Sequence, residues 1–191
     1  NIGKFGVPVI VAINDYVTDT QKEHAAIIDY CKNIGVECKI SSHWEKGGKG
    51  AADLAEEVAK IADSNSANFK TLYDNKLSLW DKTQYIAQNI YGAANIIADK
   101  KIRNQFQKLE DDGFGEYPIC MAKTQYSFST DPLLMGAPSG HDVPIKEVRL
   151  SAGAEFVVVV CGEVMTMPGL PRIPASENID VDDSGLIQGL F

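Results

Sequence analysis

Amide, acidic and aromatic side chains follow an apolar run near the start of the chain. Residues 7–13 are almost all apolar, and Asn14, Asp15 and Tyr16 come directly after them. A run of this kind predicts a strand buried on both faces of a parallel sheet. Ligands of open α/β sheets bind outside the carboxyl ends of the strands, so these side chains are candidates for a binding crevice.

Asn14 and Tyr16 each have a functional and a structural interpretation. The Asn14 amide has donors and an acceptor that suit the edge of a heterocycle, and the Tyr16 ring offers a face for stacking. The structural alternative is that Asn14 closes a turn while Tyr16 packs at the sheet edge. Position in the sequence favours neither interpretation.

Trp44 is a second aromatic candidate. It lies in a glycine-rich loop, residues 41–50, which follows the next predicted strand, residues 36–40. In a parallel sheet this loop leaves the sheet at the same end as Tyr16. The two rings are therefore candidates for aromatic plates on either side of a flat ligand. The alternative is a tryptophan that folds back and covers the core.

Other catalytic signatures fail. Residues 46–50 read Lys-Gly-Gly-Lys-Gly, but the first glycine and the final Ser or Thr of a Walker loop are missing. His24, His43 and His141 lack metal-ligand spacing, so we expect no metal site. Neither Gly-x-Ser-x-Gly nor His-Glu-x-x-His occurs. The residues alone predict a binding crevice without a complete catalytic constellation.

Alternating strand-like and helix-like segments predict an α/β fold. We expect a parallel-sheet β-α-β-α unit, then a helical segment and a smaller, strand-rich α+β part. These divide the chain into two predicted domains, residues 1–64 and 65–191, with an irregular, proline-rich tail from Met165. The predicted strands are 7–13, 36–40, 118–122, 148–150 and 156–161, and the predicted helices are 19–34, 51–63, 78–91 and 98–111.

The first predicted helix, residues 19–34, has clear signals at both ends. Threonines before it suit an N-cap, and Gly35 suits the position just past its last turn. Its apolar spacing places Ala25, Ile28 and Cys31 on the face that packs against the sheet.

Composition excludes several classes of partner. The chain has 191 residues, of which 45% are hydrophobic and 23% charged, as in ordinary globular proteins. Its net charge of -8 argues against nucleic acid and anionic membrane, which both require basic patches. No signal peptide and no apolar run of about 18 residues is present. The four cysteines form no Cys-x-x-Cys pair, which predicts free thiols in the cytoplasm.

Blocks of sequence along the whole chain match the motifs of one family. They are residues 11–14, 18–20, 44–48, 68–70, 72–74, 90–92, 121–129, 147–153, 165–171, 177–182 and 189–191. Together they resemble formate–tetrahydrofolate ligase. The match covers about the C-terminal third of the family's polypeptide, and the chain opens at Asn1 rather than Met. We therefore expect a fragment of a longer polypeptide.

The resemblance implies an ATP-dependent ligase of one-carbon metabolism. In the family, formate attacks the γ-phosphate of Mg-ATP, and N10 of tetrahydrofolate then takes the formyl group from formyl phosphate. The family's phosphate-binding loop and basic catalytic residues belong to the N-terminal part, so we expect no activity from this chain alone. The resemblance also implies a homo-oligomer in the full enzyme and a monovalent cation, which has no place on these residues.

Motif alignment carries individual roles onto this chain. The family's aromatic sandwich around the folate ring falls on Tyr16 and Trp44, with Ile40 as an apolar wall. The contact to the nucleotide base falls on Asn14, with Val17 in the same loop. The family's Asn-Arg-Phe-Pro reads Asn-Asp-Tyr-Val here, so the ring is kept but its new hydroxyl needs water or a partner.

Two other functions fit the same residues. One is an ATP- or GTP-using ligase of similar topology that acts on a different acceptor. The other is a non-catalytic folate- or nucleotide-binding module. The sequence before Asn1 would discriminate among them. The formate ligase should have a phosphate-binding loop and the basic residues for formyl phosphate there, whereas a start codon directly upstream of Asn1 would favour the binding module.

Overall fold

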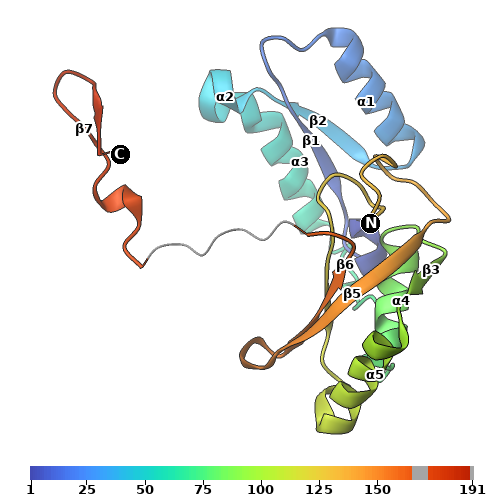
Figure 1. The fold of residues 1–191 in the computed structure, drawn as a ribbon. Helices are drawn as coiled ribbons and strands as arrows, with labels where there is room; N and C mark the ends of the chain where they lie inside the picture. The colour runs from blue at the N-terminus through green and yellow to red at the C-terminus, as the bar shows by residue number, and fades with distance from the viewer. Residues whose placement is uncertain (165–171, 190–191) are drawn as a thin grey trace.

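The fold is α/β, as predicted, in a computed structural model that describes residues 1–164 and 172–189 (Figure 1). It contains a parallel strand pair, a mixed four-stranded sheet and a small antiparallel pair. The helices are α1 (Gln21–Asn33), α2 (His43–Lys46), α3 (Ala52–Asp63), α4 (Leu79–Asn89) and α5 (Lys100–Leu109), and the strands are β1 (Ile10–Asn14), β2 (Glu37–Ser41), β3 (Asn95–Ile97), β4 (Ile119–Ala122), β5 (Asp142–Ser151), β6 (Phe156–Cys161), β7 (Asp180–Val181) and β8 (Ile187–Gln188). Among the described residues, no helix is both long and apolar enough to cross a membrane.

The first unit is the predicted β-α-β-α arrangement. β1 and β2 run parallel with Asn14 opposite Ser41, so their carboxyl ends coincide. Figure 1 shows α1 and α3 on either side of this strand pair. Within the described residues β1 pairs with β2 alone. Only Ile13 of β1 is buried and Ala12 is exposed, so the predicted burial on both faces is not reached within this chain.

The inner face of α1 differs from the prediction by one residue. His24 and Cys31 are buried and Ile28 is half-buried, whereas Ala25 is exposed. His24, Ile28 and Cys31 are spaced by four and three residues, which places them on one face of a helix. The predicted set, with Ala25 in place of His24, has an equally helical spacing. The apolar pattern missed His24 because a search for apolar residues does not count an imidazole as a core side chain.

The glycine-rich segment is helical rather than a loop. Trp44 lies in the single turn of α2, and a 3-10 turn over residues 47–51 leads into α3. The Ser42 amide donates to the Gly50 carbonyl at 3.0 Å. A Cβ on Gly50 would lie 2.4 Å from the Ser42 oxygen, so this close return requires glycine.

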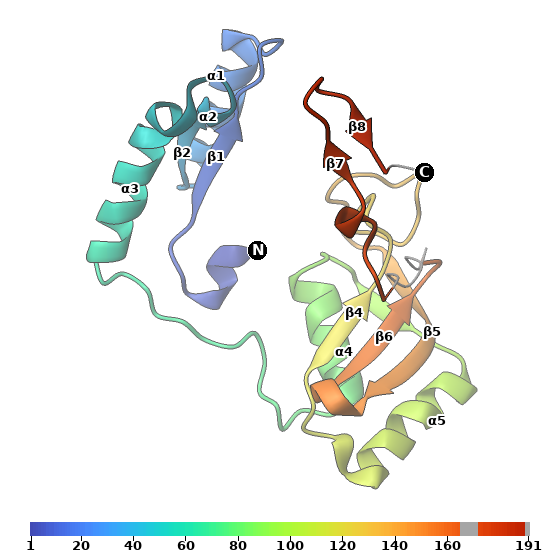
Figure 2. The same cartoon turned by 90° about the vertical axis from the view of Figure 1, so that its left-hand side faces the viewer.

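The second sheet has the strand order β3-β5-β6-β4 (Figure 2). β5 runs parallel to β3 and antiparallel to β6, and β4 runs parallel to β6. The predicted strand 148–150 lies near the C-terminal end of the longer β5, and β3 was missed because three residues give too short a pattern. The main core lies between this sheet and helices α4 and α5; it includes Leu79, Ala87, Ile96, Ile102, Phe106, Val143, Ile145, Val157, Val159 and Cys161.

The tail beyond Met165 is not wholly irregular. Residues 165–171 lie outside the described part, but β7 and β8 form an antiparallel pair. The Asp182 carboxylate holds the turn by accepting from Ser184 Oγ at 2.6 Å, the Leu186 amide at 3.0 Å and Gln188 Nε2 at 2.8 Å. These hydrogen bonds lower the pKa of Asp182 to about 2.

A helical turn at the N-terminus connects the two larger units. The Lys70 amide donates to the Phe5 carbonyl at 2.9 Å, and the Asn68 amide donates to Gly6 at 2.7 Å. Asn1 Nδ2 reaches the Ile90 carbonyl at the end of α4 at 2.9 Å. The division into domains 1–64 and 65–191 stays a prediction.

Lys82 is a fully buried cation in the second unit. Its Nζ donates to the carbonyls of Gly115 at 2.6 Å and Tyr117 at 3.1 Å. Burial lowers the pKa of Lys82 below its usual range. The ammonium thus secures the segment between α5 and β4, which has no strand partner at this point.

We expect Lys82→Met to lower the free energy of unfolding by about 1–3 kcal/mol, because two carbonyls lose their donor in a site closed to water. The measurement is urea denaturation followed by circular dichroism. The control is Lys101→Met, which changes an exposed lysine of α5. Equal denaturation midpoints for the two variants would contradict a structural role for the buried ammonium.

Candidate functional site

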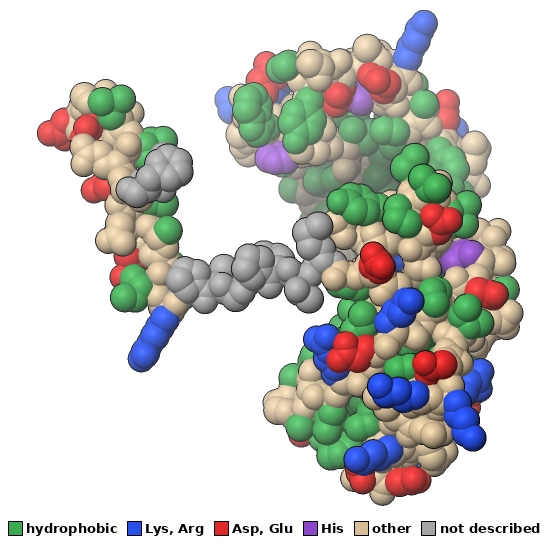
Figure 3. Space-filling view, in the orientation of Figure 1, with side chains coloured by type: hydrophobic (Ala, Val, Ile, Leu, Met, Phe, Trp, Pro, Cys, Tyr) green, Lys and Arg blue, Asp and Glu red, His purple; other side chains and the backbone are tan. Residues whose placement is uncertain are grey.

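The structure brings the predicted aromatic and amide residues to one end of the first sheet. Asn14 is the last residue of β1, and Trp44 lies in α2, three residues beyond the end of β2. The Tyr16 residue is 55% exposed and Trp44 is 73% exposed. Trp44 therefore does not fold back over the core. Figure 3 shows hydrophobic side chains exposed over α2 at this end of the molecule, with acidic side chains beside them.

The hydroxyl of Tyr16 has a partner within the site. Asn14 Nδ2 donates to Tyr16 Oη at 3.1 Å. This bond uses one of the two amide hydrogens of Asn14 and leaves its Oδ1 available to a ligand. The bond thus orients the Asn14 amide against the exposed tyrosine ring.

The other two predicted contact residues differ in their exposure. Ile40 is half-buried in β2, where its backbone partner is Ile13. Val17 is 82% exposed in the loop between β1 and α1. Ile40 therefore borders the apolar interior of the strand pair, whereas Val17 faces solvent.

A capping box fixes the loop after β1. Thr20 caps α1 by accepting from the Glu23 amide, and the Glu23 carboxylate accepts from the Thr20 amide at 2.8 Å. The hydrogen bonds that this carboxylate accepts from the Thr20 amide and hydroxyl lower the pKa of Glu23. Asp19 adds a second tie, because its Oδ2 accepts from the Tyr16 amide at 3.0 Å. The direction of the Tyr16 backbone is thus set by the start of α1.

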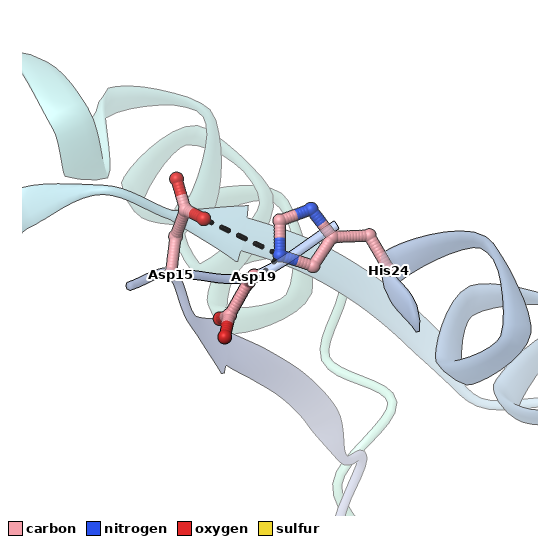
Figure 4. Close-up of side chains that lie close together, drawn as sticks. All are labelled: Asp15, Asp19 and His24. Carbon is pink, nitrogen blue, oxygen red and sulfur yellow. Dashed lines mark ion pairs between the residues drawn. The ribbon is translucent and has the colours of Figure 1, made fainter. Parts of the chain in front are cut away.

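The same loop gathers a cluster that the sequence analysis missed. His24 Nε2 lies 3.3 Å from Asp15 Oδ1 and 3.7 Å from Asp19 Oδ2 (Figure 4). Asp19 precedes the N-cap and His24 is the fourth residue of the helix, the two positions that meet in a hydrophobic staple. A polar pair at these positions, across a Thr-x-x-Glu capping box, was the signal available in the sequence.

A cavity lies in the second unit, away from these residues. A cavity of about 450 Å³ is lined by residues 121–128 together with Tyr91 and Gly136. Lys123 Nζ lies 5.1 Å from the centre of the Tyr91 ring and donates to the carbonyls of Thr124 and Ser127. Burial lowers the pKa of Lys123. These contacts already engage the Lys123 ammonium. The lysine is therefore part of the packed lining of the cavity and not a cation free to bind a ligand.

The chain is thus an α/β protein whose parallel strand pair carries an exposed amide and two exposed aromatic rings at its carboxyl edge, the edge at which ligands of open α/β sheets bind. A family profile described as "Formate--tetrahydrofolate ligase" matches residues 1–191. The chain therefore belongs to the formate–tetrahydrofolate ligase family.

Relatives in several bacteria bear the name formate–tetrahydrofolate ligase. The chain is 56% identical over 191 residues to the protein of Ruegeria pomeroyi, which it covers to 34% of its length. It is 57% identical to the protein of Roseobacter denitrificans and 53% identical to that of Pelagibacter ubique, again over the whole chain and 34% of each relative. The chain thus spans about a third of the length of the curated relatives it matches.

We expect Thr20→Ala to lower the free energy of unfolding by about 1 kcal/mol, because the first turn of α1 loses its side-chain cap. Thr18→Ala is the matched control, since Thr18 is exposed in the same loop. Urea denaturation of both variants measures the difference. A Thr20→Ala midpoint equal to that of the control would contradict the capping role.

Proposed function

We propose that this chain forms the folate-stacking wall and part of the nucleotide pocket of an ATP-dependent formate–tetrahydrofolate ligase. The reaction joins formate to tetrahydrofolate through formyl phosphate and gives 10-formyltetrahydrofolate. Family membership and the names of the relatives support the reaction. The observation that carries the local role is the pair of exposed rings, Tyr16 and Trp44, at one edge of the strand pair.

Stacking explains why two exposed aromatic residues occur at this edge. A fused heterocycle such as the pterin of folate is flat, and aromatic pairs gain free energy beyond the area that they bury. The rings of Tyr16 and Trp44 are exposed and can take such a ring, and we assign the apolar wall of the site to Ile40, which is half-buried in β2. Tyrosine and tryptophan also lose little conformational entropy on binding.

Asn14 is the proposed contact to the nucleotide base. Its Nδ2 is already hydrogen-bonded to Tyr16 Oη, so the amide is oriented before any ligand arrives. The Asn14 oxygen and the remaining amide hydrogen match the donor and acceptor edge of a base. Val17, exposed in the same loop, adds apolar contact.

The remaining parts of the reaction require more chain than is present. No Walker loop occurs in this sequence, and phosphoryl transfer depends on positioned phosphate-binding groups and Mg²⁺. We assign these, and the monovalent cation, to the rest of a longer cytoplasmic polypeptide that assembles as a homo-oligomer. β1 has one strand neighbour among the described residues, which leaves an edge for such a partner segment.

The aromatic wall is tested by a folate analogue that quenches tryptophan fluorescence. Trp80 packs on Phe106 and Arg103, away from the proposed site, so a Trp80→Phe background isolates the emission of Trp44. In that background we expect Tyr16→Ala to weaken binding between about twofold and tenfold, the equivalent of one aromatic contact.

The matched control for the aromatic wall is Tyr30→Ala, since Tyr30 is 66% exposed on α1 but lies outside the proposed site. Unchanged affinity in Tyr16→Ala, or an equal loss in both variants, would remove Tyr16 from the site. Absence of quenching in the background protein would show that this chain does not form the wall by itself.

A further prediction follows from assigning the phosphate-binding groups to the rest of a longer polypeptide. The purified 191-residue chain should form no 10-formyltetrahydrofolate from formate, Mg-ATP and tetrahydrofolate, because it lacks a phosphate-binding loop. The full-length Roseobacter denitrificans relative, assayed in parallel, is the positive control. Turnover by the chain above the enzyme-free rate would overturn the proposed division.

A further inference from the structure

We propose that Asp15, Asp19 and His24 form a binding site for a divalent transition-metal ion such as Zn²⁺, at the loop that joins β1 to α1 (Figure 4). The side chains offer one imidazole nitrogen and two carboxylate oxygens. His24 is buried, whereas Asp15 and Asp19 lie in the loop beside Tyr16 and are partly exposed.

The spacing of the three side chains fits a shared ion. Ligand atoms about 2.0–2.2 Å from a tetrahedral metal lie roughly 3.3–3.6 Å from one another. His24 Nε2 lies 3.3 Å from Asp15 Oδ1 and 3.7 Å from Asp19 Oδ2. All three ligand atoms lie within 4.8 Å of one another. Small rotations of the two carboxylates would therefore complete the three contacts.

His24 supplies the independent evidence that a ligand belongs here. The residue is only 4% exposed, and neither ring nitrogen has a hydrogen-bond partner. Figure 4 shows Nε2 turned towards the carboxylates, yet neither contact has hydrogen-bond geometry. Buried polar atoms without partners are destabilising and rare in native proteins. An ion on Nε2 would satisfy this atom and both carboxylates together.

The backbone holds the cluster in place before an ion binds. The capping box of α1 fixes Asp19 and His24 on either side of Thr20. The Asp15 amide donates to the Ser41 carbonyl at 3.0 Å, which ties the loop to β2. The Asp15 and Asp19 side chains are 27% and 31% exposed, so water can reach the open side and supply a further ligand.

Electrostatics at the site favours a cation. The N-terminus of α1 weakly opposes a positive charge. Two adjacent carboxylates offset this, because each attracts a divalent ion at direct-contact distance in a partly buried setting. The nitrogen ligand then selects the kind of ion, since imidazole suits Zn²⁺ and its neighbours whereas Mg²⁺ prefers oxygen ligands and retained water.

Zn²⁺ alone, titrated into the chelator-treated chain by calorimetry, tests the site. We expect one ion per chain, no competition from Mg²⁺, and at least about tenfold weaker binding in His24→Gln and in Asp15→Asn, since even outer partners of metal ligands change affinity about 10–100-fold. His43→Gln, which alters an exposed histidine outside the cluster, should bind as the parent does.

Two measurements keep the test decisive. Near-ultraviolet circular dichroism selects variants that keep the native packing, and Asp15→Asn preserves the shape of the side chain if His24→Gln fails to fold. Co²⁺ in place of Zn²⁺ should show no thiolate charge-transfer band. Unaltered Zn²⁺ affinity in the folded Asp15→Asn variant, or a thiolate band that assigns the ion to cysteine, overturns the site. Neither folate nor nucleotide is present, so failure here leaves the aromatic wall untouched.

Discussion

The parallel pairing of β1 with β2 is the constraint on which the binding edge depends. Its register places Asn14 opposite Ser41, so both strands end at the same level. The loop that carries Tyr16 and the helix that carries Trp44 leave from that level. Because side chains alternate along a strand, a slip by one residue would turn Ile13 outwards and Asn14 inwards. Burial of Ile13 therefore also determines where the amide of Asn14 points.

The start of α1 turns this edge into a defined loop. A capping box ends the loop at Thr20, and the Asp19 carboxylate accepts from the Tyr16 amide. The Asn14 and Tyr16 side chains are then joined by their own hydrogen bond. Asp15 and Asp19 belong to the same loop and approach His24 of α1, so aromatic, amide and acidic groups share one short piece of backbone.

The second unit is stabilised mainly by its apolar core. Its sheet is covered by α4 and α5, and its core is almost wholly apolar. Lys82 and Thr83 are buried there with partners: Lys82 donates to two carbonyls and Thr83 Oγ1 donates to the Leu79 carbonyl at 2.7 Å. The first unit is less closed, because β1 has one strand neighbour among the described residues. That contrast agrees with a chain that spans about a third of its relatives' length.

The sequence by itself determined the α/β class, the order of most elements, the family, and the edge on which Asn14, Tyr16 and Trp44 lie. Those features depend on local periodicity, caps and motifs. Only the tertiary structure revealed β3, the inward position of His24 in place of Ala25, and the cluster with Asp15 and Asp19. Such features depend on which face a helix buries and on which loops meet. Hydropathy cannot rank a histidine against an alanine for a buried face, because the strand against which the face packs makes that choice.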